Sequence, residues 1–399
     1  MSEKLEGDKD GLGATVASHY NHLQETGVEA RKESRIYYMR GFNNWVKSTL
    51  INDFMEKVRR KAPSGSKFNI LDLASGKGGD QRKWKIAKVH RVVHADIAAT
   101  SVQQSEERYN EMKKKQNPRY PIFDAEFHAI DCSKERLRER LSDPSMQFDL
   151  TSCQFSYHYS FESLEQADLW MRNACENLKP GGFFIGTTPD ARELMRRLKE
   201  SDSNSFGNDV YRVTFDSTTD FPLFGCKYDF HLEGVVDCPE FLVHFGTLEK
   251  IAEKYGMIPV YKENFATLFE QRIKDSRNVD LLKRMNALEE YPAARGKQLV
   301  AVSEDAYQKA ADKLKELNES GDSDSNRHKV LTISRDEWEA ITVYLAFAFQ
   351  KLGTPAPEDE EYLSQSPADS EEPTEKRKLS DSDAEEESPT KKPPLAIVT

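Results

Sequence analysis

The chain has 399 residues, of which 37% are hydrophobic, so it has room for one large domain together with segments that lie outside its core. No stretch approaches the roughly 20 apolar residues of a membrane span, and the polar start MSEKLEGDKDGLG lacks the apolar run of a signal peptide. The formal net charge is −11, but residues 353–399 hold 13 acidic and 5 basic residues, so the remainder is nearly neutral and can carry a local basic patch.

The cysteines are odd in number and form no CxxC pair. This pattern predicts reduced core thiols in a cytosolic or nuclear protein, and it gives no reason to expect a disulfide framework or a metal site. The five are Cys132, Cys153, Cys175, Cys226 and Cys238.

The chain divides into three predicted segments. Residues 1–15 are polar and are predicted to be disordered, residues 16–352 form the folded domain, and residues 353–399 form a disordered acidic tail rich in Ser and Pro. The domain begins with a helical pattern, rich in aromatic residues and cations, which the sequence APSGS ends after Lys61.

Strand-like and helix-like segments then alternate, which is typical of an α/β protein. The strands recur about 25 residues apart with a helix between them, and this spacing predicts right-handed crossovers and a parallel sheet. Ligands of such sheets lie beyond the carboxyl ends of the strands, so we expect the functional site there. The predicted strands are 68–73, 91–97, 125–132, 148–159 and 183–189.

From about Ser201 to Phe230 the pattern loosens into an insertion. VYRVTF and LFGCKYDFHL predict strands, CPEFLVHFGTLEKIAEKYG predicts a helix with Glu240 near its start, and PVYKENF predicts an extended segment. Residues 334–352 return to apolar content, and we expect them to pack against the body of the domain.

The sequence LDLASGKGGDQRKW, residues 71–84, follows the first strand with a turn rich in glycines and cations. Its spacing is neither the GxGxxG of dinucleotide sites nor the GxxxxGK[ST] of phosphate loops. It matches the [LVI]D[LV]GxGxG pattern of methyltransferases that use S-adenosylmethionine, with Ala74 in place of one glycine. We expect the backbone contact to the cofactor to survive the extra methyl of Ala74, and any effect to be a weaker cofactor affinity.

Two acidic residues end the next two strands. Asp96 is placed to accept charge-assisted hydrogen bonds from the ribose hydroxyls of the cofactor, and Asp131 lies where the adenine amino group would be read. Either aspartate alone fits a cap or a turn, but both together favour a methyltransferase fold. The fourth strand runs into SCQFSYHYSFES rather than the [DN]PP[YF] of many DNA amino-group methyltransferases, so a base amino group is disfavoured as the methyl acceptor.

The chain resembles the eukaryotic mRNA cap guanine-N7 methyltransferases over roughly Val16 to Lys351. The resemblance implies a class I, Rossmann-like α/β methyltransferase with a seven-stranded, mostly parallel sheet, helices on both faces, N-terminal helices and an insertion that covers the substrate site. The glycine turn alone is not specific, whereas the longest matches are. The matching motifs are VASHYN, FNNWVKS, DLASGKGGDQRKW, DIAATSVQQSEERY, CQFSYHYSFESLEQADLWMRNAC, LKPGGFFIGTTP, FPLFGCKYDFHLEGVVDCPEFLVHF and AITVYLAFAF.

This resemblance implies the site residues one by one. The cations on the glycine loop and the following helix would face the cap triphosphate, while the small residues admit the cofactor. The implied cofactor contacts are Lys47, Ala74, Gly76, Asp96, Asp131, Gln154 and Tyr159. The implied cap contacts are Asn43, Asn44, Lys77, Lys83, Arg108, His158, Glu240 and Tyr344.

Among these, Glu240 is expected to accept hydrogen bonds from guanine N1–H and N2–H, each worth roughly 1.5–3 kcal/mol, and to favour the positive charge that N7 methylation creates. Guanine N7 carries a lone pair and no proton, so the reaction is an in-line displacement and no catalytic acid or base is assigned. His158 would contact the guanine and Tyr159 would wall the methyl-transfer pocket. Asn43 and Asn44 would form part of a lid with Lys47.

Plainer interpretations stay open for individual residues. Lys77 and the other cations fit solvated surface charges, Glu240 fits a helix N-terminus, and Tyr344 fits the core. For the whole chain, the alternatives are methylation of another RNA or a protein, and a cap- or RNA-binding module without catalysis. Dependence on a triphosphate-linked guanosine and cofactor binding distinguish these alternatives.

The resemblance also implies partners and a location. We expect capped mRNA as the substrate, a nuclear location, a monomeric catalytic chain with no membrane partner, and, as in some relatives, a small activating subunit and contact with the capping machinery. The basic clusters 376–378 and 391–392 fit a nuclear import signal, beside Ser380, Ser382 and Ser388 as phosphorylation sites.

Overall fold

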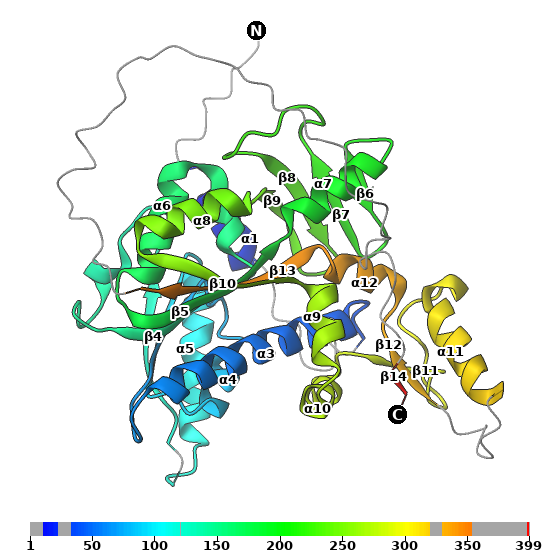
Figure 1. Ribbon diagram of the computed structural model, residues 1–399, viewed down its shortest axis with the longest axis horizontal. Coiled ribbons are helices and arrows are strands. Elements are labelled where there is room, and N and C mark those ends of the chain that lie inside the picture. Colours follow the sequence, from blue (N-terminus) through cyan, green and yellow to red (C-terminus); the bar gives the residue numbers. More distant parts are fainter. Residues whose placement is uncertain (1–10, 23–32, 120, 320–328, 353–396, 399) are drawn as a thin grey trace.

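A seven-stranded sheet forms the centre of the computed structural model, which describes residues 11–22, 33–119, 121–319, 329–352 and 397–398 (Figure 1). Its strands are β1 (Asn69–Leu73), β2 (Arg91–Asp96), β3 (Asp124–Ala129), β4 (Phe148–Gln154), β5 (Leu178–Pro189), β10 (Met257–Asn264) and β13 (Tyr344–Lys351). They lie in the order β10-β13-β5-β4-β1-β2-β3. β1 to β5 pair in parallel, and β13 runs antiparallel to both of its neighbours. The predicted class I methyltransferase sheet, seven-stranded and mostly parallel, is therefore confirmed.

Hydrophobic side chains cover both faces of this sheet, because successive side chains of a strand point to opposite faces. In β5, Ile185 belongs to one core cluster and its neighbour Phe184 to the other. Figure 1 shows α3 on one side of the sheet and α6 and α8 on the other. The first cluster takes side chains from α3 (Tyr37–Lys61), α4 (Gln81–Ile86), α5 (Ala99–Lys114), α7 (Ala191–Glu200), α9 (Phe265–Arg272), α10 (Ser276–Arg284) and α12 (Arg335–Ile341). The second takes them from η1 (Leu137–Arg140), η2 (Tyr157–Glu162), α6 (Leu164–Cys175) and α8 (Phe245–Lys254).

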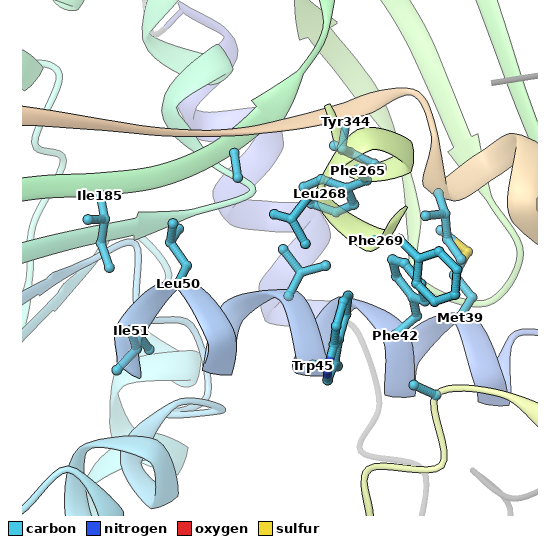
Figure 2. Close-up of a cluster of buried hydrophobic side chains, with 14 of the residues drawn as sticks. Met39, Phe42, Trp45, Leu50, Ile51, Ile185, Phe265, Leu268, Phe269 and Tyr344 are labelled. Carbon is cyan, nitrogen blue, oxygen red and sulfur yellow. The ribbon is translucent and has the colours of Figure 1, made fainter. Parts of the chain in front are cut away.

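Helix α3 is buried along most of its length, and this fixes one border of the functional site. Phe42 and Trp45 pack against Phe269 of α9, with ring centroids 5.6 and 6.0 Å apart. Leu50 points toward the sheet beside Ile185 (Figure 2). Each fully buried side chain of this size stabilises the fold by about 1.5–3 kcal/mol. Burial of these side chains anchors the helix whose N-terminal half lines the site described below.

The insertion forms a second sheet, four-stranded and antiparallel, and the strands predicted from VYRVTF and LFGCKYDFHL both belong to it. Its strands are β6 (Ser205–Gly207), β7 (Tyr211–Phe215), β8 (Lys227–Leu232) and β9 (Val236–Phe241). The expected helix around Glu240 is wrong, because this residue lies in β9 and α8 begins only at Phe245. β9 pairs with β8, Tyr228 opposite Glu240, and Pro239 in its middle is a poor helix residue.

A small third sheet lies away from the site. It consists of β11 (Glu289–Tyr291), β12 (Val330–Thr332) and β14 (Ile397–Val398), with η3 (Glu304–Tyr307) and α11 (Gln308–Glu319) beside it in the chain. Residues 334–352 form α12 and β13, and β13 lies inside the main sheet, so their expected packing against the domain is confirmed.

The N-terminal boundary differs from the prediction. Helix α1 (Gly11–His22) includes residues 11–15, which the sequence placed in a disordered segment. Val16 is buried and Leu12 packs against the second core cluster, so these apolar side chains hold the start of the helix in place. Residues 1–10, and all of the predicted tail except Ile397 and Val398, lie outside the described residues. Within the described residues, no helix is both long and apolar enough to cross a membrane.

A buried carboxylate joins α12 to the start of α3. Glu337 accepts hydrogen bonds from the backbone N–H of Met39 (3.1 Å) and from the Ser334 hydroxyl (2.7 Å), and one oxygen lies 3.6 Å from the Arg35 guanidinium. Burial raises the pKa of Glu337 to about 7, against the opposing effects of the Ser334 hydroxyl and Arg35.

This raised pKa predicts a pH-dependent loss of stability. The unfolded chain ionises Glu337 near its ordinary pKa of 4.5, whereas the folded chain holds the proton until about pH 7. Between these values the unfolded state binds fewer protons, so the free energy of unfolding falls by about 3 kcal/mol as the pH rises. The variant Glu337→Gln is expected to lose this slope, with Glu253→Gln, on exposed α8 surface, as control. Urea unfolding at pH 5 and pH 8 measures it, and parallel profiles for wild type and Glu337→Gln would contradict the account.

Candidate functional site

Two adjoining cavities lie at the carboxyl ends of the parallel strands. The first cavity is lined mainly by residues that follow β1 to β4 and by helix α1. Its lining residues are Leu12, Gly13, Val16, Tyr20, Ala74, Ala95, Asp96, Ile97, Ile130, Asp131, Cys132, Ser133, Ser156, Tyr159, Glu162, Gln166 and Trp170. The expectation that the site lies at these strand ends agrees with this position.

Asp96, the last residue of β2, is one of three carboxylates in the lining of the first cavity, with Asp131 and Glu162. Its Oδ2 accepts the backbone N–H of Gly76 (2.8 Å) and its Oδ1 that of Ala98 (2.9 Å). Burial raises the pKa of this carboxyl, and the two backbone hydrogen bonds oppose the rise. The carboxylate thereby ties the glycine turn after β1 to the end of β2.

Asp131 lies at the next strand end, after β3. Its Oδ1 accepts both the backbone N–H of Ser133 (2.9 Å) and the Ser133 hydroxyl (2.6 Å). The other oxygen, Oδ2, faces α1, since a Cβ placed on Gly13 would lie 3.1 Å from it. A glycine at this point of α1 leaves room between the helix and the carboxylate.

The glycine turn has left-handed backbone at three of its small residues. Ala74 has a φ of +51°, Gly76 a φ of +50° and Gly78 a φ of +71°. Nothing lies within 4 Å of the point where a Cβ on Gly76 would stand, so this side of the turn is open. Glycine adopts such a φ at no steric cost, whereas alanine adopts it only with a steric cost from its Cβ.

The second cavity lies between α3, the β8–β9 hairpin and β13. Its lining residues are Tyr20, Tyr37, Arg40, Gly41, Asn43, Asn44, Lys47, Phe155, His158, Tyr159, Leu232, Val235, Val236, Glu240, Met285 and Tyr344. Glu240 is only 2% exposed. Its Oε2 accepts the Tyr228 hydroxyl (2.9 Å), and its Oε1 lies 3.3 Å from Nε2 of His158. A buried carboxylate with so few donors has acceptor sites left for a ligand.

Two tyrosines separate the cavities. Tyr20 of α1 and Tyr159 line both, and their hydroxyl oxygens are 3.1 Å apart. The Tyr159 hydroxyl also lies 3.4 Å from the Cys238 sulfur. Burial raises the pKa of both phenols well above the ordinary value, so the wall between the cavities is neutral.

A buried carboxylate organises the cations at the mouth of the second cavity. Asp80 accepts from Lys47 (3.0 Å) and from Lys83 (2.6 Å), and Lys83 also donates to Asn44 Oδ1 (2.9 Å). Burial lowers the pKa of the Lys83 ammonium, and Asp80 opposes that shift. The network joins α3 to the segment that follows the glycine turn.

The structure therefore divides the expected site residues into three groups. Ala74, Asp96 and Asp131 line the first cavity, and Tyr159 lines both. The expected cap residues Asn43, Asn44, His158, Glu240 and Tyr344 line the second, and so does Lys47, which was expected at the cofactor. Outside both linings are Gly76, Lys77, Lys83, Arg108 and Gln154.

Gln154 departs most from expectation. The Gln154 side chain is buried and bonded within the sheet, to Ser152 Oγ (3.0 Å) and Thr187 Oγ1 (3.2 Å). Asn43 and Asn44 lie inside helix α3, within the stretch that the sequence predicted to be helical.

Sequence reasoning missed several lining residues. Tyr20 is the most important, since it stands in the quoted motif VASHYN and helical spacing alone gave it no role. Glu162 was also missed; it accepts the Leu12 backbone N–H (3.2 Å) and the Gln166 amide (2.7 Å), which fastens α1 over the first cavity. The acidic residue in the motif SYHYSFES was the available signal for it.

Comparison with known proteins decides the family. The family model of the mRNA (guanine-N(7))-methyltransferase domain matches residues 3–352. The chain belongs to this family. The resemblance inferred from the motifs is thus confirmed.

Relatives in this family span animals and plants. The chain is 45% identical to the mRNA cap guanine-N(7) methyltransferase of Drosophila melanogaster over 341 residues, 84% of this chain and 76% of the relative. It is 41% identical to the protein of that name from Caenorhabditis elegans, over 87% of this chain and 89% of the relative. It is 36% identical to the mRNA cap guanine-N(7) methyltransferase 1 of Oryza sativa subsp. japonica, over 85% and 82%.

The left-handed alanine leads to a stability prediction for this family member. Ala74→Gly removes a backbone cost of about 1–2 kcal/mol and adds a chain-entropy cost of about 0.5–1 kcal/mol. We expect the free energy of unfolding to stay the same or rise by up to about 1.5 kcal/mol. Ala95→Gly is the matched control, since this buried β2 alanine lines the same cavity, and there we expect a loss of about 1 kcal/mol. Urea unfolding without ligand measures the free energy of unfolding of both variants. An equal loss of this free energy in Ala74→Gly and Ala95→Gly would refute the backbone strain at Ala74.

Proposed function

We infer that the chain transfers the methyl group of S-adenosylmethionine to N7 of the 5′ cap guanosine of mRNA, converting GpppN into m7GpppN. Family membership supports this reaction. The observation that carries it is the buried carboxylate of Glu240 in a cavity that shares the Tyr20–Tyr159 wall with the cavity of Asp96. A methyl donor and a methyl acceptor need two adjoining sites of this kind.

The first cavity has the groups that S-adenosylmethionine requires. A carboxylate has about four acceptor sites, and Asp96 uses two of them on backbone N–H groups, so others remain for the ribose hydroxyls. Asp131 keeps Oδ2 for the adenine amino group. The Ser75 hydroxyl is buried without a hydrogen-bond partner among the described residues, and the open side of Gly76 gives the cofactor access to the backbone.

The remaining expected cofactor contacts have different support. Tyr159 borders the cofactor cavity directly, and Ala74 lines it. Gln154 lies behind the lining, so we propose that it supports the end of β4. Lys47 faces the second cavity, so we assign it to the cap side.

The second cavity suits a guanine base. Glu240 would accept from N1–H and N2–H, as only guanine presents this pair of donors, and Tyr228 holds the carboxylate in place. His158 and Tyr344, which both line the second cavity, would contact the guanine ring. A carboxylate in a buried site also favours the positive charge that guanine gains on methylation.

The cations would bind the triphosphate. Lys47 and Lys83 bring two ammonium groups to one buried carboxylate, which leaves a net positive charge beside Asn43 and Asn44. Lys77 and Arg108 are proposed as further phosphate contacts.

The residues of the chain need not move a proton, because guanine N7 has a lone pair and no hydrogen. S-adenosylmethionine supplies an electrophilic methyl group when it is bound. The contribution of the chain is alignment, worth up to roughly 7–11 kcal/mol in favourable cases. Tyr20 and Tyr159 exclude water between the cavities and stay uncharged.

Partners and location complete the proposal. We infer that the substrate is capped mRNA, that the chain acts in the nucleus as a monomeric catalytic subunit, and that a small activating subunit and the capping machinery are its protein partners. The proposed import clusters lie outside the described residues.

Methyl transfer by the purified chain tests the function. Labelled S-adenosylmethionine is supplied with GpppG-capped RNA, ApppG-capped RNA and uncapped triphosphate RNA. We expect label only on the GpppG-capped RNA, at N7, because Glu240 selects guanine. Equal labelling of all three would contradict the cap assignment, and activity that requires an added protein would support the activating subunit.

A further inference from the structure

One stretch of the surface is strongly basic in a chain whose net charge is negative. Residues 57–91, all of which the structure describes, contain eleven Lys and Arg residues and two carboxylates, Asp72 and Asp80. Both carboxylates are buried. The exposed charge of this stretch is therefore entirely positive.

Part of this basic stretch lies along the line of contact between α3 and α4, here called the seam, which begins at the second cavity. At one end Lys83 of α4 donates to Asn44 of α3, which lines the cavity. At the other end the Arg59 guanidinium donates to the carbonyl of Ala87, just after α4. Asn44 and Arg59 are fifteen residues apart on one helix, so the seam is about 22 Å long.

Exposed cations follow the α4 side of this seam. Gln81 and Trp84 form the buried face of α4, while Arg82 and Lys88 are exposed and Lys85 is half-buried. Among the described residues, no carboxylate lies within ion-pair distance of these three cations. In this they differ from Lys47 and Lys83, which Asp80 holds.

We propose that this basic seam, defined by Arg59, Arg82, Lys85 and Lys88, binds the phosphates of the RNA chain that follows the cap. The proposal rests on the proposed cap site, because the seam begins where the triphosphate would lie. A single strand carries one charge per nucleotide in a regular row, which matches cations spread along a seam. Such contacts position the RNA without reading its sequence. The seam therefore lets the enzyme favour cap structures attached to RNA over free cap dinucleotides.

Substitution of Arg82, Lys85 and Lys88 tests the seam. The variant Arg82→Gln/Lys85→Gln/Lys88→Gln removes three positive charges and keeps a polar side chain at each position. The matched control is Lys199→Gln/Lys250→Gln/Lys297→Gln, three exposed lysines on α7, on α8 and in the loop after β11. KM is measured for GpppG dinucleotide and for a GpppG-capped RNA of about 20 nucleotides at several salt concentrations.

We expect the seam variant to raise KM about tenfold for the capped RNA at low salt and to lower the slope of log(1/KM) against log salt by about 2, since each phosphate contact contributes about 0.7 for a single strand. The KM of the seam variant for GpppG dinucleotide stays at the wild-type level. The control variant keeps the wild-type KM for both the dinucleotide and the capped RNA. Unchanged KM and slope for the capped RNA would overturn the seam, and so would an equal loss for dinucleotide and RNA. Failure of the wild type to methylate GpppG would instead count against the proposed function, and the seam is then judged by equilibrium binding of the same RNA.

Discussion

The ion triad of Asp80 with Lys47 and Lys83 holds the two halves of the site together. Burial opposes ionisation of Asp80, but the two ammonium groups outweigh it and hold the pKa of its carboxyl below the usual range. Lys47 comes from α3 and Lys83 from α4, so the triad fixes α3 against the helix that follows the glycine turn. Removing the carboxylate would leave two cations uncompensated in a largely buried position, a change that commonly costs 3–5 kcal/mol.

Each of the two cavities receives its carboxylates from a different part of the fold. The parallel sheet delivers Asp96 and Asp131 at neighbouring strand ends, as the crossover topology requires. The antiparallel insertion delivers Glu240 from the opposite side, on a strand paired with Tyr228. Tyr20 and Tyr159 meet between them. The proposed reaction needs no general acid or base. The fold therefore has only to hold two sites of different charge on either side of the neutral tyrosines.

Much of this could be predicted from the sequence, where local pattern and tertiary structure agree. The five parallel strands have regular spacing, and Asp96 and Asp131 follow from it. Glu240 was misplaced on a helix because its apolar neighbours fit both periods, and only pairing with β8 decides for a strand. Gln154 carried a polar group at the right strand end, yet Ser152 and Thr187 turn its side chain into the sheet. Tyr20 reaches the site through the packing of α1, which no spacing encodes.

Equilibrium binding of the two ligands tests most directly whether separate cavities hold cofactor and cap. S-adenosylhomocysteine and GpppG are titrated into the wild type, Glu240→Gln and Asp96→Asn. Separate sites predict that Glu240→Gln weakens GpppG binding about tenfold or more, since a charge-assisted bond is worth roughly 1.5–3 kcal/mol, and leaves cofactor binding unchanged. Asp96→Asn should show the reverse pattern. If either substitution weakened both ligands equally, the two cavities would not be separate sites.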